Sequence, residues 1–182
     1  MIPIKRKCLE CALRLLGRRA HSRRELADKL SQRGFDTGQI ALAIDECIRL
    51  NYLDDASFCD TVVRHQRRKG YGRARIAQLL NEKGVAKSHI DDCLVRYCDE
   101  SAQYADCRAL SQKKKQRYLG KGAPAFCRQK LFRFLTRRGF SSTIVQRVVA
   151  ECISAEGHQG GQGDDQPGVA FSDVQDEDVI KP

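Results

Sequence analysis

The chain has 182 residues, of which 41% are hydrophobic and 31% charged, and its formal net charge is +10. Such a length suits one domain or a string of small ones. No apolar run approaches the ~20 residues that a membrane-spanning helix needs. The N-terminal Met-Ile-Pro-Ile-Lys-Arg-Lys has no apolar stretch after its charges, which argues against a signal peptide. We therefore expect a cytoplasmic protein with no membrane partner.

The charge is unevenly distributed along the chain. Residues 156–182 hold seven acidic residues and one lysine, a net charge of −6, so the remaining 155 residues carry +16. Residues 107–150 contain twelve Lys or Arg and no Asp or Glu. A body this basic favours anionic partners: nucleic acid, an acidic protein face or a membrane surface.

The acidic tail, residues 156–182, is rich in Gly, Gln and Asp. Because this composition cannot build a core, we expect the tail to be disordered. Two roles are open: it solvates the chain, or it lies on the basic third unit described below and competes with partners.

Nine cysteines raise the question of a metal or disulfide site. They stand at positions 8, 11, 47, 59, 93, 98, 107, 127 and 152. Only Cys8-x-x-Cys11 has the spacing of metal ligands, and the sequence has no second pair that would complete a four-ligand site. Most of the others fall on apolar helix faces, so we expect free thiols that pack as small apolar groups. A zinc site at Cys8 and Cys11 is the alternative.

A repeat organises the helical part of the chain. Its marks are a glycine, a leucine four residues earlier, a basic residue directly before and an apolar residue directly after. The three sets are Leu30, Arg33, Gly34 and Phe35; Leu80, Lys83, Gly84 and Val85; and Leu135, Arg138, Gly139 and Phe140. The glycines are 50 and 55 residues apart.

The repeat is typical of a helix C-cap. Glycine takes the left-handed conformation that a side chain disfavours, and the next residue folds back onto the leucine one turn inside the helix, as Phe35 onto Leu30. A basic residue beside the glycine suits the negative end of the helix dipole. Arg33, Lys83 and Arg138 are therefore caps or partner contacts.

Each repeat reads as three helices, which predicts an all-α fold of tandem three-helix units. In the first unit, leucines at 9, 13 and 16 mark a helix over residues 5–18, Ser22-x-x-Glu25 is a capping box, and Asp36 opens the third helix. We place the units at residues 1–51, 52–98 and 99–155. They should share core between neighbours and form an elongated rod, straight or curved. The joints near 51–53 and 98–101 should bury little and bend.

The central stretch, residues 52–84, predicts two helices separated by a tight turn. Asp54 and Asp55 precede an apolar-periodic run, where a carboxylate can accept the free N–H groups of a helix start. Gly70-Tyr71-Gly72 breaks this helix, and Lys83-Gly84 ends the next one. Between positions 64 and 75 stand six basic residues and no acidic one: Arg64, Arg67, Arg68, Lys69, Arg73 and Arg75. The stretch therefore joins a helical core to a solvated positive turn.

Residues that could carry chemistry do not converge. Asp54-Asp55 looks like a paired carboxylate, but a capping role is sufficient. The four histidines, His21, His65, His89 and His158, are scattered over a cap, two helices and the tail. Gly70-Tyr71-Gly72 follows a helix rather than a strand, and no Gly-Lys-Ser/Thr closes it, so it is not a phosphate loop. We expect no enzyme and no cofactor.

Paired helices joined by glycine turns also resemble helix-turn-helix units. The helix that starts at Arg73 gives Ile76, Leu79 and Leu80 to the core, and three unlike units lack the two-fold symmetry of most operator binders. Non-specific contact with single- or double-stranded DNA is favoured over sequence-specific readout. The alternative, that these cations only solvate helix faces, fits poorly with the acid-free stretch 107–150.

One combination of motifs resembles the RecX family of bacterial regulatory proteins. It consists of Tyr52-Leu53-Asp54-Asp55, Phe58, Val63-Arg64, Gly70-Tyr71-Gly72, Arg75-Ile76 and Lys83-Gly84. The flanks resemble the family's outer units at residues 12–16, 21–26 and 134–140. The resemblance covers roughly residues 8–153 and fails beyond Glu156. The cysteine abundance and the acidic tail depart from the family pattern.

The resemblance implies a function. RecX proteins bind the RecA recombinase, chiefly as its filament on single-stranded DNA. They lower its ATP hydrolysis, strand exchange and coprotease activity, and so limit recombinational repair and the SOS response. We expect a monomer that acts by occupation, and the rival reading is a nucleic-acid binder that acts without RecA. The expected contacts with the filament or DNA are Arg64, Arg67, Arg68, Lys69, Tyr71, Arg73, Arg75, Lys113, Lys114, Lys115, Arg117, Arg137 and Arg138.

Overall fold

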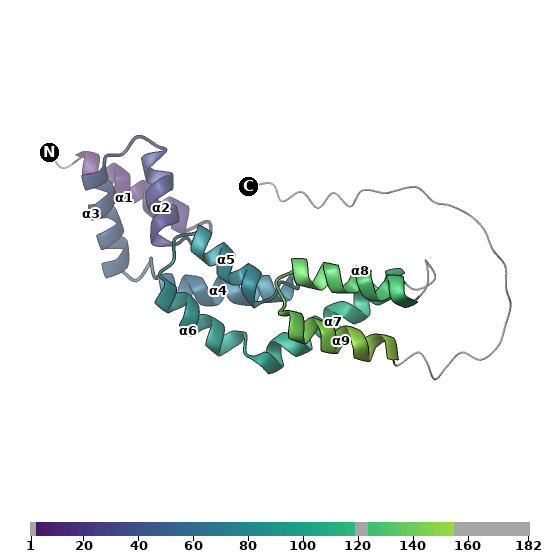
Figure 1. Ribbon diagram of the computed structural model, residues 1–182. Helices are drawn as coiled ribbons and strands as arrows, with labels where there is room; N and C mark the ends of the chain where they lie inside the picture. Colours follow the sequence, from purple (N-terminus) through teal and green to yellow (C-terminus); the bar gives the residue numbers. More distant parts are fainter. Residues whose placement is uncertain (1–2, 119–123, 155–182) are drawn as a thin grey trace, which may run out of the picture.

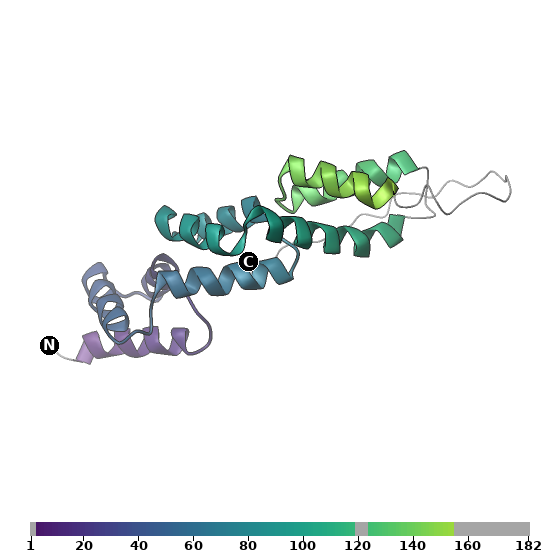
Figure 2. The ribbon, with the colours of Figure 1, turned by 90° about the horizontal axis from the view of Figure 1, so that it is seen from below.

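The computed structural model describes residues 3–118 and 124–154, which form nine α-helices and no strand (Figure 1). The helices are α1 (Pro3–Leu16), α2 (Arg23–Ser31), α3 (Thr37–Arg49), α4 (Asp55–Arg68), α5 (Arg73–Glu82), α6 (Lys87–Tyr97), α7 (Glu100–Tyr118), α8 (Pro124–Arg137) and α9 (Ser142–Ser154). They pack in three successive groups of three, displaced along one long direction (Figure 2). This confirms the predicted all-α, elongated, tandem arrangement. The acidic tail lies outside the described residues.

Each group of helices buries its own core. In the first group, Cys8, Ala12 and Leu15 are buried on α1. The leucines at 9, 13 and 16 predicted the helix, but they are only half-buried and flank this seam. Small residues at 8 and 12 let α1 approach α3 closely, and this displaces the larger leucines to the edges of the contact.

The glycine repeat forms the predicted C-caps. Gly34, Gly84 and Gly139 have φ angles of 84°, 70° and 89°. The amide that follows each glycine donates back to the leucine carbonyl five residues earlier, over 3.4, 3.2 and 3.3 Å for residues 35, 85 and 140. These bonds satisfy carbonyls that the helix itself leaves open.

Helix starts also follow their predicted signals. Asp36 and Gln39 form a complete capping box on α3. The Asp54 carboxylate accepts the amides of Ala56 and Ser57 at 3.0 and 3.1 Å, and its pKa is lowered by these bonds together with that from the Ser57 hydroxyl. The predicted capping box on α2 is half formed. Its Ser22 hydroxyl accepts the Glu25 amide at 3.1 Å, whereas the carboxylate of residue 25 binds other groups, described below.

The first joint is made by the second helices of two neighbouring groups. At the start of α2, the Ser22 hydroxyl donates to the carbonyl oxygen of Lys83, at the end of α5, over 2.5 Å. The Arg23 amide donates to Asp55 over 2.9 Å. The Glu25 carboxylate is bound by Arg19 and, at 3.3 Å, by the Lys83 ammonium. The C-terminus of α5 therefore docks on the N-terminus of α2.

The second joint repeats this arrangement one unit further along. The amide of Gly72 donates to the carbonyl of Arg138 over 2.7 Å, and that of Ala74 to Gly139 over 3.1 Å, so the C-terminus of α8 docks on the N-terminus of α5. The helices α8, α5 and α2 thus follow one another C-terminus to N-terminus, and their axes turn from each helix to the next (Figure 1).

That the joints bury little and bend stays a prediction, and the contacts between helices of different units are few. The prediction placed the joints at the linkers near 51–53 and 98–101, whereas the bonds that connect the units join helix ends 32 to 66 residues apart in the sequence.

A methyl group at position 72 should break the second joint. A Cβ on Gly72 would lie 2.4 Å from the carbonyl carbon and oxygen of Gly139, although its φ of −84° suits any residue. We expect Gly72→Ala to lower the free energy of unfolding by about 1–3 kcal/mol, as for other overpacked sites, measured by urea denaturation. Gly38→Ala, in the first turn of α3, is the control and should cost less, because its Cβ would meet only the side chain of Asp36, at 3.3 Å. Equal stability of the two variants would contradict the claim that the close contact between Gly72 and Gly139 stabilises the protein.

The charge on Glu25 should stabilise the first joint in a pH-dependent way. Burial alone would raise the pKa of this carboxyl group, but the hydrogen bond from Arg19 and the charge of Lys83 lower it from 4.5 to about 2. The contribution is therefore complete above pH 4.5 and is lost as the pH falls toward 2. We expect Glu25→Gln to cost about 1–2 kcal/mol at pH 7, allowing for solvent screening.

The measurement is urea denaturation of both proteins at pH 7, 4 and 2.5. The gap between Glu25→Gln and the parent should shrink in acid. The control is Glu46→Gln, which removes an exposed pair within α3. A gap independent of pH would show that the charge of residue 25 contributes nothing.

Candidate binding surface

The thirteen predicted contact residues cover the centre and the C-terminal third of the described body. Arg64, Arg67 and Arg68 lie on α4, Lys69 and Tyr71 in the turn after it, Arg73 and Arg75 on α5, Lys113, Lys114, Lys115 and Arg117 on α7, and Arg137 and Arg138 at the end of α8. The structure gives these side chains unequal surroundings.

Four of them meet at the second joint, in what we term the joint cluster: Lys69, Tyr71, Lys114 and Arg138, with Phe134. The Arg138 guanidinium lies 4.7 Å from the ring centroid of Tyr71 and 5.2 Å from that of Phe134, and it donates to the Lys69 carbonyl over 3.1 Å. The Lys114 ammonium lies 4.9 Å from the Phe134 ring. The cluster therefore holds two cations on aromatic rings at the boundary between two units.

The sequence placed Phe134 only in the stretch 134–140 that resembles an outer RecX unit, and its position under two cations was missed. A usable signal was present, because Phe134 and Arg138 stand at i and i+4 on one helix, where side chains meet. The pairing of Arg138 with Tyr71 could not be found that way, since it joins residues 67 positions apart.

Arg67 connects α4 to α6 and α7 through its side chain and is not a solvated cation. Its Nε donates to Asp106 of α7 over 2.7 Å and its Nη1 to the carbonyl of Tyr97 over 2.6 Å, while the side chain is 26% exposed. The bond to Asp106 raises the pKa of Arg67 further, so it is always charged. The prediction that the whole positive turn is solvated is thus wrong at this residue, because an acid 39 positions away neutralises it.

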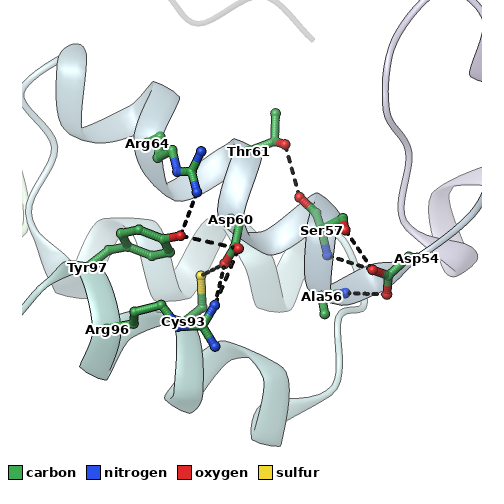
Figure 3. A network of polar contacts seen from close by, with 9 residues as sticks. All are labelled: Asp54, Ala56, Ser57, Asp60, Thr61, Arg64, Cys93, Arg96 and Tyr97. Carbon is green, nitrogen blue, oxygen red and sulfur yellow. Dashed lines mark hydrogen bonds and ion pairs between the residues drawn. The ribbon is translucent and has the colours of Figure 1, made fainter.

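Arg64 belongs to a polar network between α4 and α6 (Figure 3). It donates to the hydroxyl of Tyr97 over 2.6 Å, and that hydroxyl donates to Asp60 over 3.3 Å. The Asp60 carboxylate also forms an ion pair with Arg96 at 3.4 Å and accepts a hydrogen bond from the Cys93 thiol over 3.1 Å. Burial raises the pKa of Cys93 to about 12, so the thiol stays neutral. The single carboxylate of Asp60 serves the guanidinium groups of both Arg64 and Arg96, so the network keeps a net positive charge, held in position by hydrogen bonds.

The other predicted residues divide into engaged and exposed side chains. Arg73 lies 3.4 Å from the Cys98 carbonyl, Arg75 donates to Gln78 over 2.9 Å, and Lys115 donates to the Cys152 carbonyl on α9. Four cations are exposed and form no ion pair within the described residues: Arg68, Lys113, Arg117 and Arg137.

The groups considered for catalysis or metal binding have local roles. Asp54 and Asp55 cap α4 and bind the Arg23 amide. His21 is buried against the carbonyl of Arg19, and burial lowers its pKa. In the part of the chain that the structure describes, no group of three or more His, Cys, Asp or Glu could hold a metal ion. Eight of the nine cysteines are buried, and Cys11 is half-buried. No described helix could span a membrane.

Comparison with protein families matches three successive family models to this chain. They are described as RecX, first three-helix domain (residues 8–47), RecX, second three-helix domain (residues 54–94), and RecX, third three-helix domain (residues 101–149). The chain belongs to the RecX family. The resemblance seen in the central motif is thereby confirmed.

Curated relatives extend the RecX assignment over the helical body. A protein named Regulatory protein RecX from Halorhodospira halophila is 38% identical over 156 residues, which are 85% of this chain and 92% of that protein. The protein of the same name from Legionella pneumophila is 37% identical over 149 residues, 82% of this chain and 97% of that one.

Solved RecX structures share the fold. A crystal structure of RecX from Lactobacillus salivarius has a TM-score of 0.74 at 24% identity, covering 83% of this chain and 97% of that one. A crystal structure of regulatory protein RecX has a TM-score of 0.70 at 23% identity, covering 80% and 71% of the two chains.

Neighbouring arginines on α4 should separate structural from surface roles. We expect Arg67→Ala to lower the free energy of unfolding by about 1–3 kcal/mol, because it leaves Asp106 and the Tyr97 carbonyl without their donor. Arg68→Ala is the matched control and should change stability by less than about 0.5 kcal/mol, as is usual for exposed sites. Thermal and urea unfolding would measure both. Equal stability of the two variants would show that the bonds of Arg67 to Asp106 and Tyr97 do not stabilise the fold.

Proposed function

We propose that this protein restrains the RecA recombinase by binding its filament on single-stranded DNA. Binding would lower ATP hydrolysis, strand exchange and coprotease activity, and so limit recombinational repair and the SOS response. The observation that carries the proposal is the match of all three RecX domain models to one chain. We place this action in the cytoplasm and assign it to a monomer.

The physical basis that we propose is occupation rather than catalysis. Three units at residues 1–51, 52–98 and 99–155, joined end to end, form a body that can lie along a helical polymer and touch successive subunits. Cations held in place by the joints lose less side-chain entropy on binding than free ones do. A filament of protein and DNA offers both acidic side chains and phosphates to such a surface.

The structure sharpens which cations we propose as contacts. Arg68, Lys113, Arg117 and Arg137 are exposed and available without breaking an ion pair among the described residues. The joint cluster adds Lys69, Tyr71, Lys114 and Arg138, and Arg64, Arg73 and Arg75 complete the set. Arg67 and Lys115 would have to leave internal partners, so we rank them last.

The same cations favour a second candidate, a nucleic-acid-binding protein that acts without RecA. The two candidate functions differ in how binding depends on salt and in whether the effect requires RecA. Simple phosphate binding falls steeply with salt, linearly on logarithmic axes, and needs no RecA. Inhibition of the filament through protein contacts should persist with DNA in excess, at ratios of this protein to RecA well below one.

Removing exposed cations near the joint cluster should weaken inhibition without unfolding the chain. We expect the triple variant Arg68→Ala, Lys113→Ala, Arg137→Ala to need about 10-fold more protein for half-inhibition of RecA's DNA-dependent ATP hydrolysis, at about 0.5 kcal/mol per exposed contact. The measurement titrates the variant against RecA filaments with DNA in excess.

The matched control removes the same charge elsewhere. Lys7→Ala, Arg14→Ala, Lys87→Ala also lowers the net charge by three at exposed positions, and it should inhibit like the parent protein. If the two triple variants lose inhibition equally, net charge alone explains binding and the contact surface is wrong. If neither protein inhibits RecA without sequestering DNA, the second candidate replaces the first.

A further inference from the structure

The outward face of α8 carries a groove that differs from the joint cluster. It is an open hollow of about 800 Å³ lined by Ala125, Phe126, Arg128, Gln129, Phe132 and Arg133. These residues recur at helical spacing on one face, while Cys127, Leu131 and Leu135 on the opposite face are buried in the core. We term this surface the α8 groove.

The α8 groove combines exposed aromatic surface with unbalanced positive charge. Phe126 is 42% exposed, although it is a large apolar side chain. The Lys130 ammonium stands 5.2 Å from its ring. In the described part of the chain, Arg128, Lys130 and Arg133 form no ion pair. Such a surface suits an occupant that brings an aromatic or aliphatic side chain together with carboxylates.

The chain itself contains a segment of that chemistry outside the described residues. Residues 169–178 read Val-Ala-Phe-Ser-Asp-Val-Gln-Asp-Glu-Asp, with four acids, one phenylalanine, two valines and no cation. The whole stretch 156–182 has a net charge of −6, whereas residues 107–150 contain no acid. Charge and apolar content are therefore complementary between the segment and the α8 groove.

The fold brings the origin of this segment to the α8 groove. Helices α8 and α9 are antiparallel neighbours joined by a short turn, so the end of α9 at Ser154 lies beside the start of α8 (Figure 1). Phe171 is 17 residues further on, a reach of up to ~56 Å at ~3.3 Å per residue, against a length of ~21 Å for α8. Tethering gives the segment an effective concentration in the millimolar range.

We propose that residues 169–178 dock in the α8 groove of the same molecule. Phe171 packs against Phe126 and Phe132, and the carboxylates that follow it pair with Arg128 and Arg133. Docking masks part of the positive surface of the third unit, so an anionic partner must displace the segment before it can use these cations. This inference does not depend on RecA as the partner.

Photo-crosslinking in the full chain tests the contact directly. With p-benzoylphenylalanine in place of Phe171, irradiation should give intramolecular adducts within residues 125–133, found by peptide mass spectrometry. The groove variant Arg128→Glu, Arg133→Glu should abolish them. Adducts spread over the body, adducts elsewhere, or products of dimer size would overturn the proposal, the last by assigning the segment to a second copy.

A double-mutant cycle tests the masking. Neutralising the segment with Asp173→Asn, Asp176→Asn, Glu177→Gln and Asp178→Asn should raise affinity for an oligodeoxythymidylate about 10-fold at low salt, because the intramolecular competitor is lost. In the background Arg128→Gln, Arg133→Gln the gain should fall below about 2-fold. In the control background Arg14→Gln, Arg18→Gln it should persist. Equal gains in all backgrounds would show a diffuse field effect and refute docking.

Discussion

The structure depends on one repeated interaction, the docking of a helix C-terminus on the N-terminus of the second helix in the preceding unit. At the first joint Ser22 and Glu25 receive the end of α5, and at the second Gly72 and Ala74 receive the end of α8. Carbonyls that a helix end leaves open accept the Ser22 hydroxyl at the first joint and the amides of Gly72 and Ala74 at the second. Three small cores, each marginal at this size, thereby become one elongated body.

The fold could be predicted in large part because its signals are local. The glycine caps and the N-caps Asp36 and Asp54 depend on residues within one or two helical turns of each other, and the same cap pattern recurs after 50 and 55 residues. The joints escaped prediction for the opposite reason. Gly72 reads as a turn residue, and nothing near it in the sequence shows that Gly139 approaches within van der Waals distance.

The candidate surface could be predicted only as a list of cations. Residue type and run length identified the basic residues, but a run such as Arg67-Arg68 does not show which arginine an acid from another helix will neutralise. Likewise Lys115 turns to α9 while Lys113 faces solvent, because successive helical residues point about 100° apart. The surface that we propose is therefore smaller than the list of cations, and we centre it on the second joint.

We propose that joint geometry, and not charge alone, determines the proposed restraint of the RecA filament by this RecX-family protein. The most direct test compares Gly72→Ala with the parent protein in RecA's DNA-dependent ATP hydrolysis, since the substitution disturbs the second joint and removes no charged residue. Circular dichroism would confirm that helix content is kept, and hydrogen exchange at Ala74 would report the joint. The account predicts loss of inhibition together with loss of protection at that amide. Full inhibition by a variant whose joint has opened would contradict it.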